Sequence, residues 1–136
     1  MKRRVATYGQ HFLRGSRLIG ELVGHSNIRR RDTVIDIGAG SGAISAVLAR
    51  RAACVIAYEN ESQALILLRR NMARYGNVKI VAQDFLRAEL PREPYKVFAN
   101  IPFSLSSKII TKLAFANTPP RAIYLIVQKQ FAQKLV

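Results

Sequence analysis

Short runs of β-branched and aromatic residues alternate with helical patterns along this chain, and this alternation restricts the possible fold most strongly. The runs predicted as strands are Thr33–Ile37, Val55–Glu59, Val78–Ala82, Lys96–Ala99 and Ile123–Val127. The helical patterns are Ser16–Val23, Ala43–Arg51, Ser62–Tyr75 and Ser106–Phe115, with Ser62 as the expected N-cap and Gly76 as the residue that ends the third of them. Such alternation predicts an α/β fold with a mostly parallel sheet and right-handed crossovers, whose ligand lies beyond the carboxyl ends of the strands.

Size and charge limit the function classes that suit this chain. With 136 residues and 49% hydrophobic content, it can bury one core and is expected to form one domain. Its net charge of +14, from 22 basic and 8 acidic residues, favours a polyanionic partner, of which nucleic acid is the commonest. The basic residues form short clusters and no long tail, which favours a charged face on a folded domain over a disordered arm.

The single cysteine, Cys54, excludes an internal disulfide and a multi-cysteine metal site, and we expect it to be a buried structural thiol. No metal site is predicted. The basic N-terminus lacks the apolar stretch of a signal peptide, and no run approaches the length of a membrane span. We therefore expect a cytoplasmic protein without a membrane partner.

A glycine-rich segment, Asp36–Gly42, closes the first predicted strand and opens a helix. Glycines at this position allow a tight turn and a close approach of the backbone to a ligand. The pattern Gly38-x-Gly40-x-x-Ala43, with Glu59 about 20 residues further on, also satisfies the dinucleotide fingerprint. On this segment alone, a nicotinamide-dependent oxidoreductase remains open.

Three of the eight acidic residues, Asp36, Glu59 and Asp84, fall at or near the ends of the first three predicted strands. Glu59 could accept both hydroxyl groups of a ribose, and Asp84 could accept from an adenine amino group. Asp36 could orient the glycine loop or favour a cation in the cleft. A sulfonium cofactor suits such a negative cleft better than a pyrophosphate does, although each residue could instead be a helix N-cap or a turn residue.

Asn100-Ile101-Pro102-Phe103 follows the fourth predicted strand and is expected to form a rigid turn. The Asn100 side-chain oxygen and the Ile101 carbonyl could accept the two N–H donors of an exocyclic amino group and make its nitrogen more nucleophilic. Pro102 would keep the preceding residue extended, and Phe103 would offer a stacking face for a base. Taken without context, the same four residues are an ordinary strand-ending turn.

Together these motifs resemble the rRNA adenine-N6 dimethyltransferases, and the resemblance covers nearly the whole chain. They occur in the family's order, which is Tyr8-Gly9-Gln10-His11-Phe12-Leu13, the glycine loop, Glu59, Asp84-Phe85, Asn100-Ile101-Pro102-Phe103 and Ile126-Val127-Gln128-Lys129. The segment from Asn100 to Ile110 looks more like the erythromycin-resistance branch, which acts on 23S rRNA, than the 16S branch. That branch confers resistance to macrolide, lincosamide and streptogramin B antibiotics.

The resemblance implies a Rossmann-like fold that binds S-adenosyl-L-methionine as methyl donor, with ribosomal RNA as partner. The cofactor residues that it implies are His11, Leu13, Gly38, Gly40, Glu59, Asp84 and Asn100. His11 stands where many relatives have Asn, and Asn60-Glu61 departs from the usual apolar-acidic pair.

Members of the family also continue into further strands and a small helical RNA-binding domain. We therefore expect residues 1–136 to be a partial catalytic domain of a protein that is monomeric at full length, with an exposed sheet edge.

The expected reaction is direct transfer of the sulfonium methyl group to an unpaired adenine, and it needs no metal. Three alternatives remain open: methylation of another substrate (16S rRNA, DNA adenine or a protein glutamine), a nicotinamide oxidoreductase, and an RNA-binding module without activity.

Overall fold

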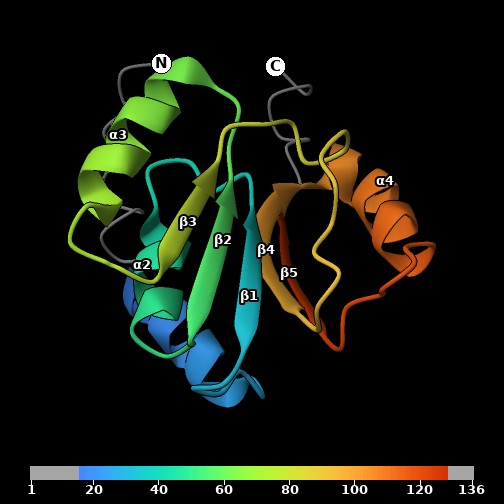
Figure 1. Ribbon diagram of the computed structural model, residues 1–136, viewed down its shortest axis with the longest axis horizontal. Coiled ribbons are helices and arrows are strands. Elements are labelled where there is room, and N and C mark those ends of the chain that lie inside the picture. Colours follow the sequence, from blue (N-terminus) through green and yellow to red (C-terminus); the bar gives the residue numbers. More distant parts are fainter. Residues whose placement is uncertain (1–15, 129–136) are drawn as a thin grey trace, which may run out of the picture.

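The computed structural model describes residues 16–128, which form one five-stranded parallel sheet flanked by helices (Figure 1). The sheet order is β3-β2-β1-β4-β5. The strands are β1 (Thr33–Ile37), β2 (Cys54–Tyr58), β3 (Val78–Val81), β4 (Lys96–Pro102) and β5 (Ile123–Gln128). The helices are α2 (Ala43–Ala49), α3 (Ser62–Met72) and α4 (Phe103–Ala114), preceded by a helical segment at 16–25. This arrangement confirms the predicted α/β class and parallel sheet.

Two core layers cover the opposite faces of the sheet, because side chains alternate between faces along each strand. Ile35 of β1 and Val97 of β4 pack with Leu113 of α4 on one face. Val34 and Phe98 pack on the other face, against α2 and the helical segment at 16–25. A third cluster joins α3 to this second face through Leu68 and Met72. In Figure 1, α2 and α3 lie on the left and α4 on the right.

The order of the strands creates a switch point between β1 and β4. From β1 the chain proceeds outward through β2 and β3, and it then returns to place β4 and β5 on the other side of β1. In parallel sheets, ligands bind outside the carboxyl ends of the strands at such a point, because the flanking connections diverge there and leave a crevice. Within residues 16–128, the strands at the two edges of the sheet are β3 and β5.

Several element boundaries differ from the predictions. The N-cap of α3 is Glu61 and not Ser62, and the Glu61 side chain accepts from the backbone N–H of Ala64. Strand β4 continues through Pro102, and α4 begins at Phe103, three residues before the predicted start. An extended Pro102 (φ −62°, ψ 144°) can end a strand and precede a helix, since the first turn of a helix needs no N–H partners.

Cys54 is half-buried at the first residue of β2, so the expectation of a fully buried thiol was wrong. None of the helices within residues 16–128 combines the length and apolar character needed to cross a membrane.

Candidate active site at the carboxyl edge of the sheet

The predicted site residues that the structure describes lie at the same edge of the sheet. Gly38 and Gly40 follow β1, Glu59 follows β2, Asp84 lies three residues beyond β3, and Asn100 lies near the end of β4. Because all five strands are parallel, their carboxyl ends share one edge, and the switch point lies between the glycine loop and Asn100. His11 and Leu13 lie outside the described residues.

The glycine loop borders open space at two of its three glycines. Gly38 and Gly40 have φ values of +66° and +59°, and within residues 16–128 no atom beyond each glycine and its chain neighbours lies within 4 Å of a Cβ built there. Gly42 is different, because its Cβ would lie 2.7 Å from Cε of Met72. The first two glycines therefore expose backbone to a ligand, and Gly42 allows α2 to pack closely against α3.

The Glu59 carboxylate is held by the backbone around it. Its Oε1 accepts from the Gly40 N–H at 2.7 Å, and its Oε2 accepts from Asn60 and Glu61 at 3.1 and 2.9 Å. A carboxylate offers about four acceptor positions, so the bonds from residues 16–128 leave one position, on Oε1. Glu59 can thus accept one hydroxyl without rearrangement, and acceptance of two would require a backbone bond to open.

Asp36 is buried in β1 with only 1% of its surface exposed, and it accepts a hydrogen bond of 2.7 Å from Oγ of Ser45. Burial raises the pKa of Asp36 to about 7; the Ser45 hydrogen bond opposes the rise and the charge of Glu59 adds to it. The bond ties the strand to α2 directly after the glycine loop. This geometry supports the loop-orienting interpretation over the attraction of a cation, since Asp36 is buried against α2 and its raised pKa favours the neutral carboxyl.

Asp84 is exposed on the connection between β3 and β4, and contacts with Tyr58 and with α4 anchor the turn around it. Its Oδ1 accepts from the Leu86 N–H at 3.1 Å, as a turn-capping residue does. Phe85 is buried edge-on against Tyr58, with ring centroids 5.1 Å apart. Lys112 of α4 donates to the Phe85 and Ala88 carbonyls, and burial lowers its pKa while the charge of Asp84 opposes this effect.

Sequence reasoning missed both Ser45 and Lys112. A serine or a lysine inside a helical pattern carries no local sign of a partner on another element. Their hydrogen bonds, to Asp36 and to the Phe85 carbonyl, span 9 and 27 positions in the chain.

The four residues Asn100–Phe103 form a direct junction between a strand and a helix, and the separate turn predicted for them was wrong. Asn100 is exposed on β4 opposite Ile126 of β5, and Ile101 is buried at 3% exposure. Phe103 begins α4 with 58% of its surface exposed. The polar and aromatic groups therefore reach the surface on a backbone that its buried neighbours hold in place.

The donor set at this edge suits an organic ligand better than a metal ion. It combines exposed glycine backbone, one remaining carboxylate acceptor on Glu59, and the amide of Asn100 beside an aromatic face. Within residues 16–128, no group of three or more His, Cys, Asp or Glu side chains could hold a metal.

Comparison with known proteins identifies relatives that are rRNA methyltransferases. The family model described as ribosomal RNA adenine dimethylase matches residues 1–136. An rRNA adenine N-6-methyltransferase from Bacillus licheniformis is 40% identical over 105 residues, covering 77% of this chain and 37% of that protein. A ribosomal RNA small subunit methyltransferase A from Streptococcus agalactiae is 32% identical over 138 residues, covering 95% of this chain and 48% of the relative.

Among solved structures, the 23S rRNA methyltransferase ErmE superposes with a TM-score of 0.74 at 29% identity, covering 87% of this chain and 48% of that one. The chain thus spans about half, or less, of the length of these relatives. The matches confirm the family resemblance and the Rossmann-like methyltransferase fold.

Proposed function

The chain belongs to the ribosomal RNA adenine dimethylase family, and on that premise we propose that residues 1–136 form the cofactor-binding part of an enzyme that methylates the N6 amino group of an adenine in ribosomal RNA. The methyl donor is S-adenosyl-L-methionine, which supplies an electrophilic methyl group on a sulfonium. The partner is ribosomal RNA, and the cellular location is the cytoplasm.

The observation that carries the proposal is the link between Glu59 and the glycine loop. The 2.7 Å bond from the Gly40 N–H to Oε1 of Glu59 places a carboxylate acceptor directly beside exposed glycine backbone. A nucleoside can bind there through its ribose, with one hydroxyl donating to Oε1 of Glu59 and the ring packing against Gly38 and Gly40. Asp84, on the turn that Lys112 anchors, would accept from the amino group of the adenine.

The residues of the β4–α4 junction then act on the target base. The Asn100 side-chain oxygen and the Ile101 carbonyl accept the two amino protons, which withdraws them from the ring plane and frees the nitrogen lone pair. The exposed ring of Phe103 stacks on the extruded adenine and holds it in line for transfer. Positioning and hydrogen bonding carry the rate enhancement.

Among ribosomal substrates we favour 23S rRNA, and with it resistance to macrolide, lincosamide and streptogramin B antibiotics. The support is the Asn100–Ile110 sequence, the 40% identity to an rRNA adenine N-6-methyltransferase, and the overlap with a 23S rRNA methyltransferase. The small-subunit methyltransferase at 32% identity makes 16S rRNA the alternative. An RNA-binding fragment without activity is the alternative from a different class.

The proposal is tested by transfer of labelled methyl from S-adenosyl-L-methionine to protein-free 23S and 16S rRNA. Asn100→Ala should abolish transfer and retain most of the cofactor affinity, whereas Asn117→Ala, at another exposed asparagine, should behave as wild type. An active Asn100→Ala variant would remove the assigned role of this residue. Label in 16S rRNA alone would reject the 23S assignment.

Cofactor binding is measured separately by calorimetric titration. Glu59→Gln should weaken S-adenosyl-L-methionine by about ten- to a hundredfold, since a hydrogen bond to a charged acceptor contributes roughly 1.5–3 kcal/mol. Binding of a nicotinamide dinucleotide in place of S-adenosyl-L-methionine would support the oxidoreductase alternative and reject the proposal.

A further inference from the structure

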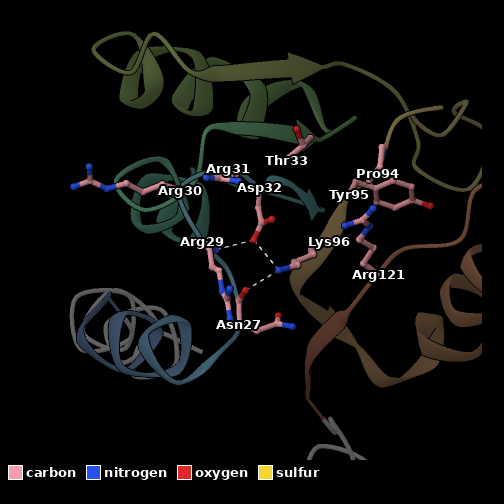
Figure 2. Close-up of a pocket in the computed structure, with 10 residues that line it drawn as sticks. All are labelled: Asn27, Arg29, Arg30, Arg31, Asp32, Thr33, Pro94, Tyr95, Lys96 and Arg121. Carbon is pink, nitrogen blue, oxygen red and sulfur yellow. Dashed lines mark hydrogen bonds and ion pairs between the residues drawn. The ribbon is translucent and has the colours of Figure 1, made fainter.

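A concave surface lies at the edge of the sheet where the strands begin, opposite the candidate active site. It has a volume of about 710 Å³, and we call it the amino-edge groove. Three separate segments contribute its lining, which consists of Asn27, Arg29, Arg30, Arg31, Asp32, Thr33, Pro94, Tyr95, Lys96 and Arg121 (Figure 2). The methylation site proposed above uses none of these residues.

A partly buried ion pair stabilises the wall of the groove. Lys96 is 8% exposed, and its Nζ lies 2.7 Å from Oδ2 of Asp32 and donates to the Asn27 carbonyl at 2.6 Å. Asp32 also accepts from the Arg29 backbone N–H at 2.6 Å. Burial alone would raise the pKa of Asp32, but the hydrogen bonds from Lys96 and Arg29 outweigh it and lower the pKa. The lowered pKa keeps Asp32 ionised at neutral pH, and its ion pair with Lys96 adds no net charge to the groove.

The remaining charge in the groove is positive and comes from arginines. With Lys96 and Asp32 paired, Arg29, Arg30, Arg31 and Arg121 leave a net charge of four. All four are exposed, and in Figure 2 the Lys96 side chain extends between Arg29 and Arg121. Like charges gathered on one concave surface repel one another, and a bound polyanion relieves that repulsion. Guanidinium groups match phosphate oxygens with two parallel hydrogen bonds.

The position of the groove separates it from the site of methyl transfer. Lys96 and Asn100 are four residues apart on β4, which at a rise of about 3.3 Å per residue places the groove roughly 13 Å from Asn100. A nucleotide whose base lies at Asn100 cannot place its own phosphate in the groove. At the roughly 3.4 Å per nucleotide of a stacked strand, this distance corresponds to about four nucleotide steps.

We propose that the amino-edge groove binds the phosphate backbone of the ribosomal RNA substrate, at a segment remote from the methylated adenine. The proposal rests on the proposed function for the identity of the polyanion. The arginines supply affinity and orientation without reading bases, because phosphate contacts carry no direct sequence information.

The test measures binding of a fluorescently labelled RNA hairpin with an unpaired adenine, between 50 and 200 mM salt, by anisotropy. The groove variant is Arg29→Gln with Arg121→Gln. The control variant is Arg69→Gln with Arg70→Gln, which removes two other exposed charges, from the last turn of α3. The groove variant should lower the slope of log affinity against log salt by about 1 per arginine and weaken binding about tenfold at 100 mM salt. The control variant should change the salt slope and the affinity by no more than about a third of these amounts.

A second groove variant, Arg29→Lys with Arg121→Lys, keeps the charge and should restore most of the slope, which separates phosphate binding from loss of folding. An unchanged slope in the glutamine variant, or an equal loss in the control, would overturn the proposal. Equal competition by duplex DNA or by anionic lipid vesicles would overturn the assignment to RNA. A wild-type chain that binds no S-adenosyl-L-methionine would reject the proposed function, whereas the salt slopes would still test the groove.

Discussion

The buried carboxyl of Asp36 should make the free energy of unfolding depend on pH. Replacement of Asp36 by asparagine should remove most of this dependence. In the folded chain the pKa of Asp36 rises from 3.8 to about 7, chiefly through burial. Between these values the folded state binds a proton that the unfolded chain has released, so the free energy of unfolding falls as pH rises. At about 1.4 kcal/mol per pKa unit, the loss across this window is about 4 kcal/mol.

The asparagine of the Asp36→Asn variant would have nearly the same shape, and its oxygen could still accept from Ser45. Its amide N–H groups need hydrogen-bond acceptors, which a carboxylate does not. Without them the free energy of unfolding would be lower by about 1–3 kcal/mol at every pH. That cost does not depend on pH, so the useful quantity is the difference between variant and wild type at successive pH values. The difference should shift in favour of the variant by about 4 kcal/mol between about pH 4 and pH 7.5.

Urea unfolding followed by far-UV circular dichroism, at intervals of half a pH unit, measures this difference, since the chain contains no tryptophan. The control is Glu21→Gln, which removes the same charge from an exposed position on the helical segment at 16–25. Parallel stability curves for Asp36→Asn and wild type would refute the reasoning, because they would mean that Asp36 ionises as it does in the unfolded chain.

Three further predictions concern packing and anchoring. Gly42→Ala should destabilise the fold by about 1–2 kcal/mol in the same urea assay, chiefly because φ is +100° and less because its Cβ would displace the flexible end of Met72; an unchanged free energy of unfolding would contradict the left-handed backbone at this position. Lys96→Met should raise the pKa of Asp32, measured by NMR titration of its carboxyl carbon, and an unchanged pKa would disprove the ion pair. Lys112→Met should speed amide hydrogen exchange in residues 84–89 at least about tenfold with little effect on β1, and uniform exchange would argue against local anchoring.

The order and type of the main elements followed from the sequence because periodicity and turn residues act locally. The β1 limits, Thr33–Ile37, were predicted correctly, and the other strands were placed to within a few residues. The start of α4 was predicted less well, since Ser106 has a local capping signal whereas Phe103 does not. Pro102 instead limits the helix through its fixed backbone angle, which permits strand on one side and helix on the other.

The edge of the sheet that carries the candidate site residues could be predicted because each residue lies at or near the end of its own strand and parallel strands end together. Glu59 and Asn100 could therefore be assigned to one edge of the sheet before any side-chain contact was known. The sequence did not show that three backbone N–H groups already occupy the Glu59 carboxylate, because those bonds depend on the local path of two loops.

By itself the sequence determined the α/β class, the placement of the elements and the edge of the sheet that carries the motifs. Only the tertiary structure showed that Asp36 is buried against Ser45, that Lys112 holds the Asp84 turn, and that Arg29 and Arg121 share one groove. The physical reason is the range of the interactions. Backbone periodicity is set by neighbours a few residues away, whereas burial, ion pairing and the gathering of charge depend on residues that folding brings together from distant parts of the chain.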